Sequence, residues 1–193
     1  MKKGTLWGIV IAVILLGISV IAGQYNSLVK LEETVKAQRG QVESVYQRRA
    51  DLIPNIVATV KREAAFEQET LRQVVEARAS ATQMKIDANN AQDFAKFQAA
   101  QGELSQALGR LMMLTENYPS LKANQAFSDL RVQLEGSENR IAVERMNYNK
   151  VVGKYNIKLR SFPTNLIAKW LGFERANLFE ATTGSEVAPV VAF

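Results

Sequence analysis

Apolar residues along this chain form one long continuous run and then recur at every third or fourth position. The continuous run extends from Leu6 to Gly23, directly behind two lysines. Roughly 18 residues at about 1.5 Å of rise each give about 27 Å of helix, close to the roughly 30 Å hydrocarbon thickness of a bilayer. The run therefore predicts a transmembrane helix over residues 6–23, with residues 1–5 on one side of the membrane.

A cleavable signal peptide is the alternative explanation for the same run. Lys2 and Lys3 would form its charged start, and residues 20–22 have the small-residue spacing that a signal peptidase accepts. Apolar regions of signal peptides usually span about 7–15 residues, so the length of this one favours a retained anchor. The lysines favour a cytoplasmic amino terminus, because basic residues tend to stay on that side. The rest of the chain would then lie outside the cytoplasm.

Small residues recur within the predicted membrane helix. Gly4, Gly8 and Ala12 are spaced four residues apart. This spacing lets two helix backbones approach closely in lipid, so the three residues are candidates for transmembrane self-association. The alternative is that small residues are simply common in membrane helices.

The periodic part of the chain begins with a helix that continues out of the membrane. Apolar residues such as Leu28, Val35 and Val42 keep helical spacing, and no helix breaker occurs before Arg49. After it, Asp51 and Pro54 suit the first turn of a new helix, because Asp can cap it and Pro needs no hydrogen-bond acceptor there. The sequence therefore predicts a second helix that starts at this point and reverses direction.

Later turn signals complete a four-helix arrangement. Turn-forming residues at 87–90 and 117–120 predict the ends of the second and third helices, and residues 161–163 predict the end of the fourth. Short connections and near-heptad, coiled-coil-like spacing favour an all-α, up-down antiparallel four-helix bundle over residues 24–161. The parity of such a bundle returns the fourth helix to the membrane, so residues 162–193 should begin at the bilayer surface.

Residues 162–193 are predicted to form a short amphipathic helix at the membrane, followed by an extended tail from Gly184 to Phe193. Aromatic and apolar residues suit the headgroup level, and lysines spaced four apart on the fourth helix could contact anionic lipid. The alternative is that the short helix closes the bundle end and the lysines complement a helix dipole. The predicted membrane-interface residues are Tyr25, Tyr155, Phe162, Leu166, Ile167, Trp170, Leu171, Phe173, Lys150, Lys154 and Lys158.

The composition removes the usual residues of catalysis and metal binding. The 193 residues include no histidine and no cysteine, so common serine, cysteine and zinc sites lack a base, a nucleophile or ligands. No phosphate-binding loop motif occurs, and the carboxylates are scattered along the helices. We therefore expect no enzyme activity, no metal and no cofactor. The net charge of +5 comes without a base-stacking aromatic motif, so nucleic acid is not an expected partner.

Several short motifs are spread over nearly the whole chain. They lie in residues 24–29, 47–55, 75–78, 116–119, 121–124 and 134–141, and in the pairs Tyr148-Asn149, Tyr155-Asn156, Phe162-Pro163 and Gly172-Phe173. Together these motifs resemble those of the LemA family of bacterial membrane proteins. One departure is Arg39, where the family often has Trp, so one aromatic contact on the first helix is not carried over.

The resemblance implies a single membrane helix with a helical bundle, in the bacterial inner membrane, and it supplies no catalytic residues. Purely structural roles also fit the motif residues: a helix start at Asp51, a helix stop at Tyr118, and ion pairs that involve Arg49, Arg140 and Glu144. The motif residues with expected structural roles are Arg48, Arg49, Asp51, Pro54, Asn55, Tyr118, Pro119, Glu138, Asn139, Arg140, Asn156 and Pro163.

These observations favour a non-catalytic scaffold of the cell envelope. The anchor would fix the protein in the membrane, and copies would self-associate into a homo-oligomer that organises or curves the lipid. Related proteins of magnetosome-forming bacteria look like participants in membrane organisation, which the resemblance extends to this chain by analogy. The alternative is a monomeric adapter that presents a helical face to another membrane protein, such as a protease or a stress-response component.

Overall fold

The computed structural model describes residues 3–62 and 67–180. Within these ranges every regular element is a helix, which confirms the all-α prediction. Residues 184–193, for which an extended tail was expected, lie outside the described residues. The helices are α1 (Lys3–Val60), α2 (Gln68–Gln83), α3 (Ala91–Thr115), α4 (Pro119–Lys122), α5 (Gln125–Arg160) and α6 (Thr164–Ile167).

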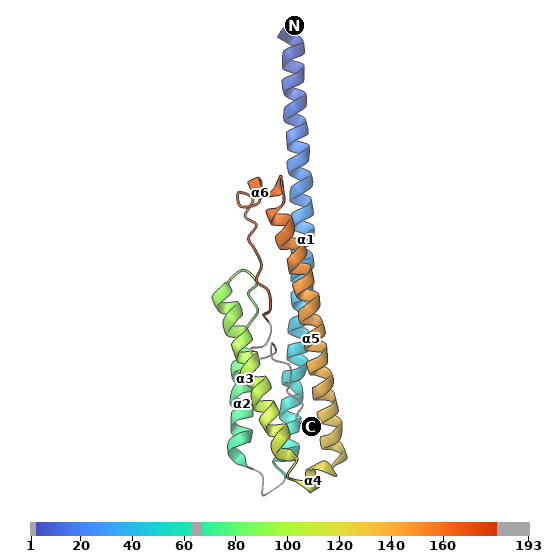
Figure 1. Ribbon diagram of the computed structural model, residues 1–193, viewed down its shortest axis with the longest axis vertical. Helices are drawn as coiled ribbons and strands as arrows, with labels where there is room; N and C mark the ends of the chain where they lie inside the picture. Colours follow the sequence, from blue (N-terminus) through green and yellow to red (C-terminus); the bar gives the residue numbers. More distant parts are fainter. Residues whose placement is uncertain (1–2, 63–66, 181–193) are drawn as a thin grey trace, which may run out of the picture.

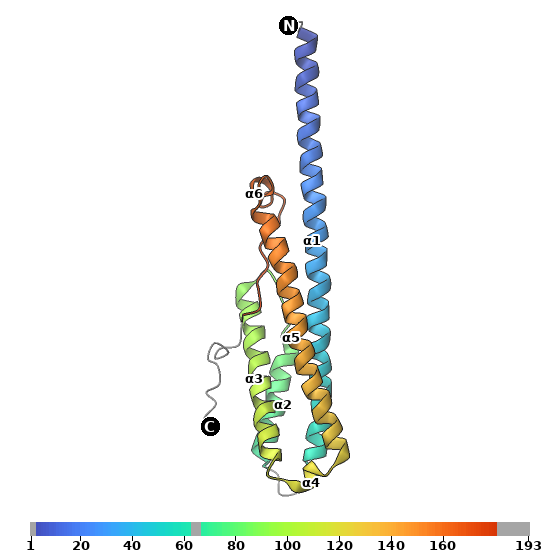
Figure 2. The same ribbon diagram turned by 45° about the vertical axis from the view of Figure 1, so that its right-hand side comes forward.

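α1 is the axis of the molecule and projects far beyond the other helices (Figures 1 and 2). α5 packs along the part of α1 that lies within the body, and α2 and α3 form a shorter pair beside them. The short α4 lies at the distal end, and α6 lies where α1 leaves the body (Figure 1). The body is therefore long and narrow. Its proximal end, at α6, is the end from which α1 projects, and its distal end, at α4, is farthest from the amino terminus.

The projecting part of α1 is strongly apolar and uncovered. From Trp7 onward it contains an 18-residue window with a mean hydropathy of 2.2, none of which is buried inside the structure. Trp7 is 67% exposed and Leu16 is 68% exposed. Among the described residues, α1 is the one helix long and apolar enough to cross a membrane. It indicates a single-pass membrane anchor.

The predicted helix break at Asp51 and Pro54 is wrong, because α1 continues through both residues to Val60. Proline inside a helix costs about 3 kcal/mol or more, since it removes one backbone hydrogen bond. Three residues of this last stretch, Ile53, Ile56 and Val60, are completely buried. Burial of such side chains contributes about 1.5–3 kcal/mol each, which exceeds the cost of the proline.

A side chain from another helix donates to the carbonyl that Pro54 leaves without an intrahelical donor. In an α-helix, the carbonyl of Ala50 would accept a bond from the N–H of residue 54, and proline has none. Arg78 of α2 donates its Nε to this carbonyl at 2.8 Å. Asp51, which was expected to cap a new helix, instead accepts a bond from Gln47 within α1 at 2.7 Å. The proline is thus accommodated in a continuous helix because Arg78, 28 residues from Ala50, bonds the Ala50 carbonyl.

The buried apolar residues form two separate clusters along the body. The proximal core, nearer the anchor, is rich in aromatic side chains and includes Tyr148, Phe94 and Phe179. The distal core is mostly aliphatic and joins the end of α1 to α2, α3, α4 and the start of α5. On α1 the two cores meet at Arg49 and Ala50, because the last proximal residue is Tyr46 and the first distal residue is Ile53.

The other helix ends lie close to the expected turns. α2 ends at Gln83, a few residues before the predicted turn, and Asn90 caps α3 by accepting from the backbone N–H groups of Gln92 and Asp93. α3 ends at Thr115, and Pro119 stands in the first turn of α4. α5 ends at Arg160, directly before the predicted stop. The predicted amphipathic helix shrinks to α6, because residues 168–172 lie in turns.

Candidate functional site

An extended segment, residues 173–180, runs back along α5 and completes the proximal core. We call it the C-terminal strap. Two asparagines of α5 hold its backbone, and each uses both ends of its amide. Asn156 donates to the carbonyl of Ala176 at 2.8 Å and accepts from the N–H of the same residue at 3.1 Å. Asn149 makes the same paired contact with Phe179, with both distances 2.8 Å.

The side chain of Phe179 anchors the strap in an aromatic pocket. It is 5% exposed, and its ring centroid lies 4.8 Å from that of Phe94 and 5.2 Å from that of Tyr148. The guanidinium of Arg145 lies over the ring at 5.0 Å. Aromatic pairs and a cation over a ring each add attraction beyond simple burial. The pocket therefore combines apolar burial with directional contacts.

Backbone groups of two further strap residues, Asn177 and Glu180, also find partners. Tyr148 donates its hydroxyl to the carbonyl of Asn177 at 3.2 Å, and Arg145 donates to that of Glu180 at 2.6 Å. The N–H of Glu180 donates to Gln98 of α3 at 3.1 Å. Asn177 bonds the carbonyl of Ala88 through both its backbone and its side chain, each at 2.8 Å. We call this set of partners on α3, α5 and the 84–90 connection the cradle.

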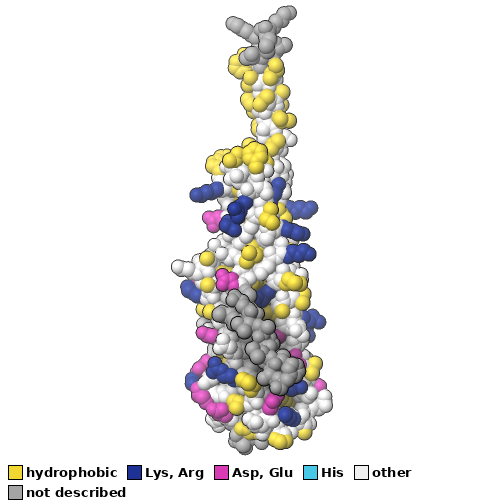
Figure 3. Space-filling view, viewed as in Figure 1, with side chains coloured by type: hydrophobic (Ala, Val, Ile, Leu, Met, Phe, Trp, Pro, Cys, Tyr) yellow, Lys and Arg dark blue, Asp and Glu magenta, His cyan; other side chains and the backbone are white. Residues whose placement is uncertain are grey.

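A second feature is an exposed apolar surface at the end of the body where α1 emerges. Phe162 is 80% exposed, Leu166 is 70% exposed and Trp170 is 83% exposed. Figure 3 shows hydrophobic side chains gathered at this upper end of the body, below the projecting anchor. Thr164 ties the segment to α1 through its hydroxyl, which donates to Gln24 at 2.8 Å. We call Phe162, Leu166 and Trp170 the apolar end patch.

Two predicted interface aromatics point inward instead. Tyr155 is 2% exposed and Phe173 is 8% exposed, so both belong to the proximal core and cannot face lipid in this structure. Burial raises the pKa of Tyr155 to about 12. Tyr25 is 44% exposed and contacts Phe173 edge to face, with ring centroids 5.7 Å apart. The physical reason is that residues after α6 fold back on α5 instead of continuing as a surface helix.

The other predicted interface residues remain near the surface. Lys150 and Lys154 are exposed on α5, and Lys158 is half-buried. Ile167 and Leu171 are half-buried beside the apolar end patch. In the membrane helix, Gly4 and Gly8 have no neighbouring atoms within 4 Å of an added Cβ, so their faces are open. Ala12 is exposed on the same helix.

Arg49 forms a buried polar layer between the two cores. Its side chain is 1% exposed, and Nη1 donates to Glu138 at 2.6 Å and to Ser105 at 2.7 Å. Nη2 donates to the side chain of Gln101 at 2.6 Å, and the guanidinium carbon lies 5.3 Å from the Tyr46 ring centroid. These contacts join α1, α3 and α5. The layer fixes the register of three helices where apolar packing is interrupted.

The remaining motif residues serve the fold or lie on its surface. Glu138 receives the ion pair from Arg49, as was expected for a contact between neighbouring helices. Glu144 accepts a hydrogen bond from Gln38 of α1 at 2.6 Å, and Arg140 is exposed. Arg48, Asn55 and Asn139 are likewise exposed, Tyr118 is half-buried, and Pro163 is half-buried next to the apolar end patch.

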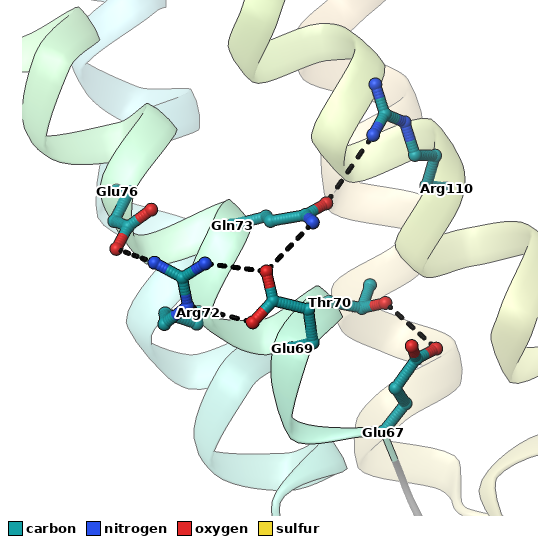
Figure 4. Close-up of polar contacts among 7 residues, drawn as sticks. All are labelled: Glu67, Glu69, Thr70, Arg72, Gln73, Glu76 and Arg110. Carbon is teal, nitrogen blue, oxygen red and sulfur yellow. Dashed lines mark hydrogen bonds and ion pairs between the residues drawn. The ribbon is translucent and has the colours of Figure 1, made fainter.

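A different polar cluster lies on the surface of α2 (Figure 4). Arg72 pairs with Glu69 at 2.6 Å and with Glu76, and Gln73 reaches Arg110 of α3 at 3.5 Å. Hydrogen bonds from Arg72 and then from Gln73 lower the pKa of Glu69 to about 2. These carboxylates are saturated by neighbouring cations and amides and point to solvent. The cluster is an exposed ion-pair network.

No catalytic arrangement emerges from the described part of the chain. A cleft of about 620 Å³ opens beside α1 and is lined by residues that include Arg39, Tyr46, Lys85 and Phe97. Among residues 3–62 and 67–180, no group of three or more acidic side chains is placed to hold a metal ion. The features that stand out among the described residues are the apolar end patch, the cradle that holds an extended segment, and the apolar helix that is long enough to cross a membrane.

The cradle is the feature that sequence reasoning missed. Tyr148-Asn149 and Tyr155-Asn156 were noted only as motifs shared with the family, although their seven-residue spacing places both asparagines on one face of α5. That spacing was the one signal in the sequence that two equivalent asparagine side chains line the same face of α5. The strap itself shows no periodicity that would reveal where it packs.

Comparison with known proteins gives one family and a small set of relatives. The sequence profile of the LemA family matches residues 38–193. The chain is 26% identical over 182 residues to magnetosome protein MamQ 2 of Paramagnetospirillum magneticum, covering 84% of this chain and 67% of the relative. It is 25% identical over 182 residues to magnetosome protein MamQ of Magnetospirillum gryphiswaldense, covering 84% and 66%. It is 22% identical over 163 residues to protein LemA of Metamycoplasma hominis, covering 84% and 72%.

Proposed function

This chain belongs to the LemA family, and from that premise we propose that it is a non-catalytic, membrane-anchored scaffold whose copies associate and organise the lipid around them. The observation that carries the proposal is the apolar end patch at the base of the membrane helix. Phe162, Leu166 and Trp170 are 70–83% exposed beside an anchor that is itself uncovered. An exposed apolar surface of this kind marks an interaction site.

The position of the patch supports lipid as its partner. Aromatic side chains favour the headgroup level, and the patch lies where α1 leaves the body. Lys150 and Lys154 are exposed on the last turns of α5, where they can attract anionic headgroups. The body would thus rest its proximal end on the bilayer. Two contacts, the anchor and the patch, would hold its angle to the membrane.

The course of the chain supports a single up-down antiparallel bundle as the rigid part of this scaffold. α1 leads away from the anchor, α2 and α3 form a hairpin, and α5 returns toward the anchor (Figure 1). Such a bundle presents long parallel sides to its neighbours. Gly4, Gly8 and Ala12 offer a small-residue face within the membrane, which allows close helix pairing there. Relatives named magnetosome proteins fit a role in organising a membrane.

The decisive measurement is the mass of the full-length protein in mild detergent by light scattering. It is compared with a truncated chain that begins at Gln24. A defined assembly of the full-length chain supports the scaffold, and the truncated chain tells whether the membrane helix or the bundle holds it together. A full-length monomer would refute self-association.

Lipid contact by the patch has a separate test in vesicle flotation. The chain from Gln24 should float with anionic vesicles, and the double variant Leu166→Ser, Trp170→Ser should float much less. Met113→Ser is the matched control, because Met113 is 67% exposed at the far end of α3. Equal flotation of all three proteins would refute a role for the patch in lipid contact.

An adapter remains the second candidate, and one face of α5 favours it. Val132, Val143, Met146 and Ile157 are 49–68% exposed. At 3.6 residues per turn they fall within about 60° of one another, so they form a single outward stripe. A partner helix could pack on this stripe. Photocrosslinking from position 146 to a protein other than a second copy would favour the adapter.

A further inference from the structure

The contacts of the strap have the character of ligand binding. Asn149 and Asn156 bond the N–H and the carbonyl of single residues, Phe179 and Ala176. Tyr148, Arg145 and Gln98 bond further backbone groups of the same segment. All these backbone groups occur in any extended peptide. The cradle thus recognises an extended backbone, and the Phe179 pocket adds selectivity for an aromatic side chain.

From this geometry we propose that the cradle is a peptide-binding site and that, in assemblies, it binds the strap of a neighbouring copy. This exchange rests on the self-association proposed above and names the contact that carries it. A strap from a second copy can make the same hydrogen bonds and fill the same pocket, because every copy of the chain has the same strap and the same cradle. Exchange therefore costs none of the contacts described for the strap.

The connection to the strap allows such an exchange. Residues 161–172 hold only the four-residue α6 and turns between α5 and the strap. Gly172 has φ of 83°, a left-handed conformation that favours glycine, and it directs the chain into the strap. Eight extended residues reach at most about 28 Å, which is comparable with the width of a small bundle. A change at this turn would redirect the strap without unfolding α5.

Concentration decides between the closed and the exchanged form. A short connection gives the strap an effective concentration of about millimolar at its own cradle, so isolated copies stay closed. Copies anchored by α1 in one membrane have their cradles at the same height and at high local density. Exchange then competes with closure, and each exchanged strap links two neighbours.

A crosslinking experiment tests the exchange directly, because the natural chain has no cysteine. Full-length Gln98→Cys and full-length Glu180→Cys are combined in the same vesicles and treated with a short thiol-to-thiol crosslinker. Gln98 and the backbone of Glu180 are in contact in the closed form, at 3.1 Å. Each chain carries one cysteine, so every mixed crosslink joins two chains, and strap exchange brings the two cysteines into contact.

The expected result is a mixed dimer in excess of both homodimers. Adding Phe179→Ala to the Glu180→Cys chain should reduce it by at least about tenfold, because the anchor residue is lost. Leu178→Ala is the matched control, since Leu178 is 45% exposed, and should leave the yield unchanged. A mixed dimer that persists with Phe179→Ala would reflect collision and would overturn the proposal.

The light-scattering mass of the same proteins in mild detergent separates this proposal from the scaffold. An assembly of defined mass without mixed crosslinks overturns strap exchange and leaves self-association standing. Monomers without crosslinks overturn both. The double variant Gln98→Cys, Glu180→Cys in one chain should crosslink internally when diluted, which confirms that the two cysteines are close enough to react.

Discussion

The proximal core and the distal core share α1, α3 and α5 but are closed in different ways. The distal core is covered by α2, whose apolar residues Leu71 and Val74 pack against the end of α1. The proximal core is covered by the strap, which places Phe173, Ala176 and Phe179 against α5. α2 satisfies its own backbone groups by helix formation, whereas the strap depends on side chains of other elements.

This difference identifies where the molecule opens most easily. A helix brings its hydrogen bonds with it, so it leaves only when its whole apolar face is exposed. A strap without secondary structure is held by a few side chains and one aromatic anchor. Low-free-energy openings concentrate in such segments, and binding functions are drawn from them. The proximal half therefore combines the apolar end patch with the strap, the segment that opens most easily.

Removing Arg49 should have the largest effect, because it breaks the layer that joins the two cores. Arg49→Ala removes a completely buried side chain and leaves the buried Gln101 without that partner, so it should lower the free energy of unfolding by about 4 kcal/mol. Chemical denaturation followed by circular dichroism measures it. If the layer couples the halves, the transition should also broaden or split into two steps.

Arg72→Ala is the instructive control for Arg49. Arg72 pairs with both Glu69 and Glu76, yet all three side chains are at least half exposed. Exposed ion pairs contribute little, so the denaturation midpoint should barely move. If Arg72→Ala destabilised the protein as much as Arg49→Ala, burial would not be what distinguishes the two sites.

Phe179→Ala should cause the second-largest loss of stability, and it should affect only the proximal half. Truncation of a buried phenylalanine costs about 3 kcal/mol, toward the low end of its usual range because the strap can detach. Hydrogen exchange should accelerate along the second half of α5 and the start of α3, while α2 stays protected. Uniform acceleration over both halves would contradict the separation of the two cores.

Arg78→Ala should produce a smaller loss, in the distal half. It removes the donor for the Ala50 carbonyl next to Pro54, and an unsatisfied buried acceptor costs about 2 kcal/mol. Pro54→Ala restores the intrahelical N–H, so the double variant should recover most of that loss. A double-mutant cycle with no coupling between the two positions would refute the compensation.

Alkaline pH should weaken the proximal half before the distal half. Burial raises the pKa of Tyr148 to about 12 and that of Tyr155 to about 12, and both lie in the proximal core. An unfolded tyrosine ionises near pH 10, so the unfolded state loses protons first. Stability is then complete below about pH 10 and declines as the pH rises toward 12. Replacing both tyrosines with Phe should reduce this decline in thermal unfolding scans.

The sequence was sufficient for α3, for α5 and for the apolar helix at the amino-terminal end. Apolar spacing and turn residues located α3 and α5 closely, because each of these helices buries one face and is capped by a local signal such as Asn90 or Asn124. It failed at Pro54, because the group that compensates for the missing N–H is Arg78, on another helix. The expectation that proline interrupts a helix uses only neighbouring residues, so it takes no account of a donor that another helix supplies.

The candidate site was predictable only in part, for a similar reason. Phe162, Leu166 and Trp170 are exposed, as a membrane-facing segment requires, while the structure turns Tyr155 and Phe173 into the core. The difference arises because the chain reverses after α6 and packs back on α5. Side chains that bind backbone leave little trace in a sequence, since the groups that they bind are present at every residue.

The continuity of α1 makes the membrane helix and the distal tip one mechanical part. From Gln24 to Val60 the helix extends roughly 55 Å beyond the apolar run. It behaves as a lever whose fulcrum is the bilayer surface: a change in tilt of about 20°, within the usual range for membrane helices, would swing the tip by roughly 19 Å. A small change in bilayer thickness, which resets helix tilt, would thus be amplified into a large displacement far above the lipid.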